Sequence, residues 1–406
     1  MYILLFCVCF FAGINSLFSQ GSSVSPYSAY GIGDLYPKAS IRQVGMANVG
    51  IGLSDATSLN LSNPASYSEI QLTCFDFSGY FSLVSQQSNT KSITQYSGGL
   101  NSLAFAFPTR KKFCLSMGFT PYSVTGYHFR QVETRYLDTI QFTNNLFRQA
   151  DGGLNRAFLG SGIRLTKNLS IGPELAFLFG TTNYYYSSAQ TLSNSAAVEF
   201  QNRIYANGFL GRLGVLWKDS INDKHRYSIG LISELTSKLT AENRLINYYV
   251  SDTVSLISGK ITIPMLLGLG FGLSGKSYRL GLDVSWQDWG KFKYLSRQDN
   301  LGQKWDVRIG GEWFPTSNSG YLSKVDYRAG MFFEQGYLNL RDYRLIHTGF
   351  SIGAGFPMPR SFSRIHLGLV FGTRGTTQHQ LLKENYLKIY LGVSFVDRWF
   401  IKRKID

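Results

Sequence analysis

The stretch Tyr278-Arg279-Leu280-Gly281-Leu282-Asp283-Val284-Ser285-Trp286 decides the fold, because its side chains alternate in character. Every even position is apolar or aromatic, and every odd position is polar, charged or glycine. A period of two is that of a β-strand with one apolar and one polar face. Arg279 and Asp283 lie well inside the stretch, which favours a polar face turned toward a wet lumen.

The same alternation recurs along the chain, at residues 325–334, 364–371 and 387–395. A soluble sandwich also alternates, but here the strands carry charge on one face and aromatic residues near their ends. The tryptophans that fit interfacial girdles are Trp286, Trp289, Trp305, Trp313 and Trp399. We therefore predict an all-β fold, a transmembrane antiparallel β-barrel of about 14 strands over residues 71–406.

The alternation also assigns side chains to the two faces of this barrel. The residues expected to face lipid are Leu280, Leu282, Leu367, Leu387, Ile389 and Leu391. The residues expected to line the lumen are Arg279, Asp283, Asp326, Arg328 and Glu334. The polar stretches 133–152, 184–196 and 238–258 are expected to be the longer external loops.

Composition agrees with a barrel. The 406 residues are 16% charged and 15% aromatic, and the mean hydropathy is −0.07. A helical membrane protein would be far more apolar. In a barrel only about every second strand residue is apolar, so the mean hydropathy stays near zero. The net charge is +15, but the basic residues are scattered singly and form no basic helix. We expect no nucleic-acid partner. A basic barrel facing outer-membrane lipid and lipopolysaccharide, or one with a basic lumen, is the simpler account.

Residues 1–20 have the features of a signal peptide, since Met1–Phe11 is almost wholly apolar and Ser19 precedes Gln20 at a suitable cleavage site. The run is too short for a membrane anchor, and neither Cys7 nor Cys9 follows a lipobox. The expected location is the bacterial outer membrane. Cys74 and Cys114 remain in the mature chain, and we favour unpaired thiols.

Residues 21–70 differ from the rest, with Gly, Ser, Asn and small apolar residues and little strand pattern. Their charged residues are only Asp34, Lys38, Arg42, Asp55 and Glu69. We predict that this segment folds into the lumen as a hatch, because a disordered tail would carry more charge; a flexible periplasmic tail is the alternative. The residues assigned to the hatch are Gly45, Gly50, Gly52, Asn63, Pro64 and Ala65.

Two stretches resemble the FadL-type transporters of hydrophobic compounds. The first runs from Gly45-Met46-Ala47 through Gly52 and Asp55-Ala56 to Asn63-Pro64-Ala65, and the second joins Ile263–Gly270 to Leu282–Phe292. The resemblance implies a barrel that captures an apolar ligand outside, passes it inward and gates with the hatch. It implies a ligand path that includes Tyr27 and Tyr30.

The opening Ser25–Leu35 and the closing Trp399–Lys404 resemble a branch of such barrels in type IX-secreting bacteria. This likeness implies a different role, that of a structural or accessory barrel, as plug or partner subunit of a type IX secretion translocon. Passive uptake of hydrophobic small molecules such as long-chain fatty acids is the first hypothesis, and the accessory role is the alternative.

No pattern in the chain indicates catalysis. Gly268-Leu269-Gly270-Phe271-Gly272 lacks the spacing and following helix of a nucleotide loop. The five histidines have no metal-ligand spacing. We therefore expect no enzyme activity, no cofactor and no metal.

Overall fold

Antiparallel strands form nearly all the regular structure in the computed structural model. It describes residues 23–110, 112–137, 140–190, 198–247, 252–295, 297–298, 301–315 and 320–398. The signal-peptide prediction and Trp399 lie outside these residues. The strands that form the wall are β2 (Thr73–Gln87), β3 (Ser92–Arg110), β4 (Phe113–Leu137), β5 (Ile140–Arg164), β6 (Leu169–Gln190), β7 (Val198–Ser220), β8 (Arg226–Glu234), β9 (Ser237–Asn247), β10 (Asp252–Ile263), β11 (Leu266–Ser274), β12 (Tyr278–Asp288), β15 (Gln303–Trp313), β16 (Asp326–Leu340), β17 (Tyr343–Pro357), β18 (Arg364–Gly375) and β19 (Lys383–Asp397).

The sheet closes on itself. The last strand, β19, pairs antiparallel with β2 along its whole length, from Lys383 with Gln87 to Asp397 with Thr73. β8 and β9 pair with the two halves of β7, so they act as one wall strand, and β10 and β11 form the next in the same way. The described residues thus form a closed barrel of fourteen antiparallel strands, which confirms the predicted fold.

The remaining elements are short. They are the strands β1 (Asp34–Leu35), β13 (Lys293–Tyr294) and β14 (Arg297–Gln298), and the helices η1 (Pro26–Ala29), α2 (Ile41–Val44), η2 (Pro64–Glu69), η3 (Trp289–Lys291), η4 (Leu322–Lys324) and η5 (Gln378–Gln380). In the described part of the chain no helix combines the length and the apolar character needed to cross a membrane.

A belt of large apolar side chains surrounds the barrel. Its exposed members include Leu159, Leu175, Phe209, Leu213, Leu231, Leu269, Ile309, Met331 and Phe350. Leu280, Leu282, Leu367 and Leu391 are also exposed, and Leu387 and Ile389 are partly buried. So much exposed apolar surface marks a membrane interaction, because a lipid-facing wall needs apolar side chains at alternate positions.

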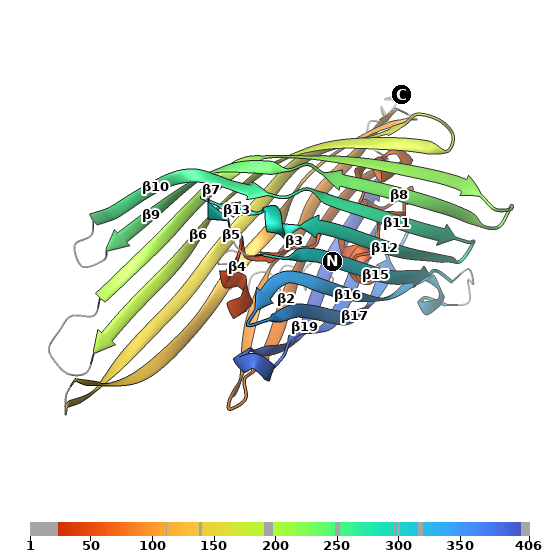
Figure 1. Cartoon of the computed structure of the whole chain (residues 1–406). Helices are drawn as coiled ribbons and strands as arrows, with labels where there is room; N and C mark the ends of the chain where they lie inside the picture. Colours follow the sequence, from red (N-terminus) through yellow and green to blue (C-terminus); the bar gives the residue numbers. More distant parts are fainter. Residues whose placement is uncertain are drawn as a thin grey trace, which may run out of the picture.

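The wall is much taller on one side than on the other. β4 and β5 have 25 residues each, and β6 and β7 have 22 and 23, whereas β12 and β15 have 11 each. A strand crossing the bilayer needs about 9–11 residues. In Figure 1 the long strands project together with β9 and β10 beyond the rest of the barrel. We call the end toward which they project the far end, and the end where β2 begins and β19 ends the near end.

This projection corrects the prediction of long polar loops. Most of residues 133–152, 184–196 and 238–258 lie in strands β4, β5, β6, β9 and β10. Once a strand leaves the lipid, its outer face no longer needs apolar side chains, so the alternation fades while the backbone hydrogen bonds continue. Trp289 was also assigned wrongly, because it is fully buried and stacks on Tyr337 at 4.4 Å instead of lying in a girdle.

The wall has a seam between β3 and β4. Only Leu103–Arg110 of β3 pair with β4, at Phe113–Phe119. Beyond that point β3 pairs only with β2, and β4 pairs with β5 and with the two-residue strand β1. The far half of β4 therefore has a backbone edge that β3 does not cover.

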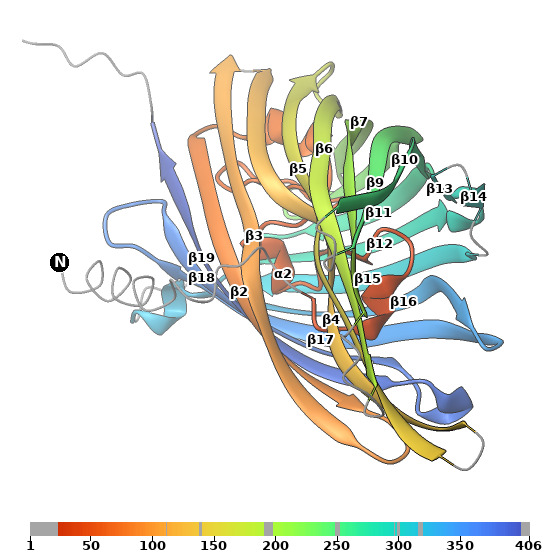
Figure 2. The same ribbon diagram turned by 90° about the vertical axis from the view of Figure 1, so that its left-hand side faces the viewer.

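Residues 23–70, the N-terminal segment, lie inside the ring of strands (Figure 2). Helix α2 packs against β17, β18 and β19, and η2 packs against β4, β5, β6 and β7. The segment thus contacts the wall on opposite sides of the barrel. Its apolar side chains, among them Ile41, Val49 and Leu61, are buried there.

Candidate functional site

Glycines bring the backbone of the N-terminal segment into direct contact with the wall. A Cβ on Gly270 of β11 would overlap the backbone nitrogen of Gly52, and a Cβ on Gly52 would overlap the backbone of Gly270. A Cβ on Gly45 would lie 3.0 Å from the Cα of Gly353 in β17. Gly50 is enclosed by side chains of the segment itself. These contacts need residues without a side chain.

The Asn63-Pro64-Ala65 triplet fixes the end of the segment. Asn63 caps helix η2 by accepting the Ala65 N–H at 3.0 Å, and Pro64 occupies the first helical turn. The Asn63 amide donates to the carbonyl oxygens of Ile51, at 2.8 Å, and of Val215 in β7, at 3.0 Å. One amide side chain therefore joins the segment to itself and to the wall.

The five charged residues of the N-terminal segment all form ion pairs with wall residues. The pairs are Asp34 with Arg374, Lys38 with Glu234, Arg42 with Glu312, Asp55 with Arg279, and Glu69 with both Arg164 and Lys218. Burying an unpaired charge is costly, so each segment charge has an opposite charge from a strand. We call these six contacts the anchoring pairs.

Glu312 of β15 is the centre of the densest cluster. Its carboxylate accepts hydrogen bonds from Arg42 at 2.6 and 2.9 Å and from the Arg328 Nε at 2.8 Å, and Arg279 lies 3.4 Å away. The Glu312 side chain is completely buried. Asp326 accepts from Arg328 at 3.3 Å, which brings three of the predicted lumen residues, Arg279, Asp326 and Arg328, into one network.

Asp55 is held in its charged form by the same network. Burial alone would raise the pKa of the Asp55 carboxyl, but the guanidinium groups of Arg42 and Arg279 outweigh burial and hold that pKa well below its usual range. Arg42 Nη1 lies 2.9 Å and Arg279 Nη1 2.8 Å from Asp55 Oδ2. An arginine of the wall and one of the segment thus share this carboxylate.

Asp283 of β12 binds backbone rather than side chains of the segment. Its Oδ2 accepts the N–H groups of Gly50 and Ile51 at 2.7 and 2.9 Å. Near it, Arg308 of β15 donates to the Ala47 carbonyl oxygen at 3.2 Å. The predicted lumen residue Asp283 therefore holds the tight turn at Gly50 against the wall.

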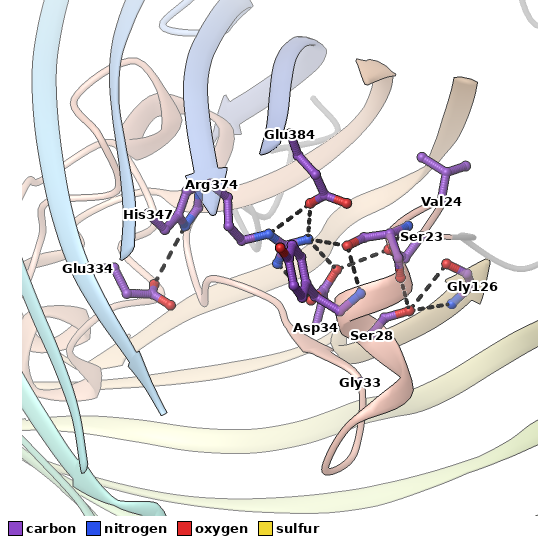
Figure 3. A network of polar contacts seen from close by, with 12 residues as sticks. Ser23, Val24, Ser28, Gly33, Asp34, Gly126, Glu334, His347, Arg374 and Glu384 are labelled. Carbon is purple, nitrogen blue, oxygen red and sulfur yellow. Dashed lines mark hydrogen bonds and ion pairs between the residues drawn. The ribbon is translucent and has the colours of Figure 1, made fainter. Parts of the chain in front are cut away.

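A second network surrounds Arg374 of β18 (Figure 3). Its Nη1 lies 2.8 Å from Asp34 Oδ1, and its Nη2 lies 2.7 Å from Glu384 Oε2 and donates to Ser25 Oγ at 2.6 Å. Ser28 Oγ in turn bonds the backbone of Gly126 in β4, as both donor and acceptor. Arg374 thus links β18 and β19 to the start of the N-terminal segment.

Glu334 lies apart from the other predicted lumen residues. Its carboxylate is 3.1 Å from Lys304 Nζ and 4.0 Å from His347 Nδ1. His347 in turn shares a hydrogen bond of 2.7 Å with the Tyr386 hydroxyl. The shared strand face of Asp326, Arg328 and Glu334 is therefore divided between two networks.

Beside the N-terminal segment lies a cavity of about 300 Å³ lined by acidic and basic side chains in equal number. Lys38 reaches into it and pairs with Glu234, which also lies 3.4 Å from Arg212. Burial lowers the pKa of the Lys38 ammonium to about 8, although the Glu234 carboxylate opposes this. Tyrosine, leucine and valine side chains complete the lining, so this cavity has both charged and apolar parts.

The two tyrosines assigned to a ligand path have separate places. Tyr27 is buried, its hydroxyl donates to the Leu382 carbonyl at 2.5 Å and accepts from the Leu382 N–H at 3.1 Å, and burial raises its pKa to about 12. Tyr30 is 45% exposed and lines a second cavity, of about 440 Å³, with Tyr184, Tyr186 and Leu301. Tyr27 is an anchor in this structure, and Tyr30 borders the more aromatic space.

The described residues contain no group of three or more His, Cys, Asp or Glu side chains that could hold a metal ion. Cys74 and Cys114 are free and buried, and their thiols are not bonded to each other.

The model of the BamG family matches the chain over residues 1–406, its whole length. The chain belongs to the BamG family. A search of curated proteins found no relative that matches it.

Solved structures of outer-membrane transporters share the fold. The chain is similar to a FadL homologue of Pseudomonas aeruginosa, with 11% identity, a TM-score of 0.57, and coverage of 89% of this chain and 99% of that one. It is similar to the toluene transporter TbuX of Ralstonia pickettii, with 13% identity, a TM-score of 0.59 and coverage of 90% and 99%. It is also similar to the toluene transporter TodX of Pseudomonas putida, with 16% identity, a TM-score of 0.57 and coverage of 91% and 100%. This BamG-family chain therefore has the FadL-like fold.

The residues that anchor the segment of this BamG-family chain were only partly found from sequence. Arg279, Asp283, Asp326 and Arg328 were assigned to the lumen and the segment with Arg42 and Asp55 to the hatch, but Glu312 and the pairing of these charges were not predicted. A usable signal existed, because a low-charge segment enclosed by a barrel can keep its few charges only with opposite charges on the wall.

Proposed function

We propose that this chain is an outer-membrane barrel with a closed axis that serves as an accessory subunit of a larger outer-membrane assembly. The observation that carries the proposal is the six anchoring pairs, which join the N-terminal segment to wall strands on opposite sides of the barrel. A hatch that must move for each transported molecule would have to break several buried ion pairs, and breaking one such pair costs about 3–5 kcal/mol.

The surfaces of the barrel support this role. Lipid covers the apolar belt, and the near end faces the periplasm, because the hairpins that extend far beyond the bilayer are extracellular in such barrels and here they lie at the far end. The far end then stands outside the cell among lipopolysaccharide. The tall side made by β4–β7 adds a large folded surface there, which an axial conduit does not need. The type IX secretion translocon is the one assembly that the sequence resemblance suggests.

Uptake of hydrophobic molecules is the second candidate, and one observation favours it. The cavity beside Tyr30 is lined largely by tyrosine and leucine side chains and opens at the far end. The fold is also that of the toluene transporters TbuX and TodX. In this alternative the N-terminal segment is a gate, and the charged cavity lies beside the apolar path.

Reconstitution separates the two candidates. Proteoliposomes would contain the whole chain or a variant that lacks residues 23–66, and the probes would be a small sugar and a fluorescent long-chain fatty acid. The accessory role predicts no entry of either probe with the whole chain, and sugar entry with the deletion. Fatty-acid entry above the protein-free rate with the whole chain would overturn the closed-axis proposal and support uptake.

A second measurement tests the assembly itself. The whole chain, tagged at its native locus and extracted in mild detergent, is expected to migrate at a mass well above 45.6 kDa, with partners in fixed ratio to it. A monomer in every mild detergent, after crosslinking in intact cells as well, would contradict the accessory role.

A further inference from the structure

The outer edge of β4 already accepts a strand from the N-terminal segment. β1 pairs antiparallel with it, Asp34 with Val124 and Leu35 with Ser123. The Tyr36 N–H donates to the Tyr122 carbonyl at 2.9 Å. One step farther along, the N–H and C=O of Gly126 both bond the Ser28 hydroxyl, at 3.0 and 3.2 Å. The edge of β4 therefore forms hydrogen bonds, and its stretch from Tyr122 to Gly126 is already bonded to the N-terminal segment.

The occupied positions set the pattern for the rest of the edge. Backbone groups of a strand point to the same side every second residue, and β4 has no register shift beyond Ser123. The next positions whose N–H and C=O point away from β5 are His128, Arg130, Val132, Thr134 and Tyr136. All five residues are exposed, and within the described part of the chain no strand pairs with this side of them.

This edge lacks most of the features that usually prevent strand addition. From Tyr127 to Leu137 the strand contains no proline, no lysine and no bulge, and its charged residues are Arg130, Glu133 and Arg135. The Arg130 side chain turns back over its own sheet, where it donates to Asn145 at 2.7 Å and lies 5.2 Å from the Phe147 ring centre. It therefore leaves the backbone edge open.

Apolar side chains on the same strand are exposed. Val132 is 56% and Tyr136 is 69% exposed, and across the seam on β3 Tyr96 is 63% exposed. Val132 and Tyr136 lie near the end of β4, one of the strands that project at the far end (Figure 1). An open edge bordered by exposed apolar side chains is the arrangement that binds an extended peptide by strand addition.

We propose that the edge of β4 from His128 to Tyr136 is a docking site for an extended strand of a partner protein at the cell surface. The partner strand continues the hydrogen-bond ladder that β1 begins, so the ladder determines where the strand binds. Its apolar side chains pack against Val132 and Tyr136. Five edge positions take a strand of about 10 residues. The inference rests on the accessory role proposed above and names the surface that role uses.

Residue-resolved hydrogen exchange tests the docking site. The backbone amides of residues 127–136 would be followed in the complex extracted from native membranes and in the purified chain in lipid nanodiscs. We expect exchange at least tenfold slower in the complex at His128, Arg130, Val132, Thr134 and Tyr136, and little change at the odd positions, which β5 already protects. Alternating protection is specific to backbone pairing, because lipid or a covering domain slows every position.

A matched pair of variants gives a second readout. Val132→Pro removes one outward N–H and should lower the yield of the complex at least tenfold, whereas Val132→Thr keeps the backbone and should change the yield less than twofold. Heat-modifiable gel mobility shows that both barrels fold. Equal yields for the two folded variants, or equal exchange in both samples, would overturn the proposal.

Two further outcomes would also overturn it. Concentration-dependent protection in the purified chain would mean that a second copy pairs through β4. Uniform protection in nanodiscs would mean that lipid covers the edge. If the complex forms but the edge stays unprotected, the docking site is wrong and the accessory role stands; if no complex forms, the accessory role itself fails.

Discussion

Arg42 and Glu312 lie 270 residues apart in the sequence, yet they form a two-point ion pair in the middle of the barrel, with distances of 2.9 and 2.6 Å. Glu312 also accepts from Arg328. The neutral variant Glu312→Gln would leave buried arginines without compensation, so we expect the free energy of unfolding to fall by about 3–5 kcal/mol. Urea titration followed by gel mobility measures it.

The control is Glu242→Gln on β9, because Glu242 pairs with Arg244 at the surface. Exposed pairs contribute about 0–1 kcal/mol, so this variant should unfold close to the parent. Equal losses in the free energy of unfolding for the two variants would show that the buried Arg42–Glu312 pair stabilises the barrel no more than an exposed pair does.

Acid should loosen the N-terminal segment through Asp55. The folded pKa of Asp55 is lower than its ordinary value, so its stabilising contribution is present above about pH 4 and is lost as the pH falls below that value. We expect protease cleavage within residues 23–70 to increase below about pH 4, and Asp55→Asn to show part of that cleavage already at pH 7. A cleavage rate independent of pH in the parent would contradict this.

Bulk added to a wall glycine should displace the segment without unfolding the wall. A Cβ on Gly230 of β8 would overlap the carbonyl of Ile51, whereas a Cβ on Gly211 of β7 meets only the flexible Leu235 side chain, at 3.2 Å. We expect Gly230→Val to expose the segment to protease and to raise sugar entry into proteoliposomes. Gly211→Val should do neither, and similar behaviour of the two variants would count against the close packing.

Two arginine substitutions locate the membrane on the outer surface. Leu213 of β7 lies in the apolar belt and Val132 of β4 lies on the projecting side, and both are exposed. Leu213→Arg should lower the free energy of unfolding by about 2–4 kcal/mol, because arginine faces hydrocarbon there. Val132→Arg should change it by less than about 0.5 kcal/mol, as at an ordinary surface position. A large cost at position 132 would place the projection in lipid.

The barrel could be predicted because lipid imposes alternation on the residues that face it. Leu280 and Leu282 point out and Asp283 points in, as the period of two requires. Where that constraint ends, the prediction failed: residues 140–152 continue as strand although no apolar face marks them. Trp289 was misplaced because aromatic residues suit both an interface and a packed lumen.

The candidate site was predicted in part for a similar physical reason. The glycines near Gly45 and Gly52 and the Asn63-Pro64-Ala65 triplet are local patterns, visible in one stretch of sequence. Pairs such as Asp34 with Arg374 join residues 340 positions apart, and only the three-dimensional register of fourteen strands brings them together. Charge neutrality required that such partners exist, but it could not say which.

The anchoring pairs also constrain how the protein can be made. Arg42 and Asp34 leave the ribosome early, but their partners Glu312 and Arg374 belong to strands synthesised near the end of the chain. Through most of synthesis and export Arg42 and Asp34 therefore lack their partners in the wall. The segment can be enclosed only after β15 and β18 have been made. A chain that ends before these strands therefore cannot bind its N-terminal segment inside the barrel, and the segment stays accessible to a quality-control protease.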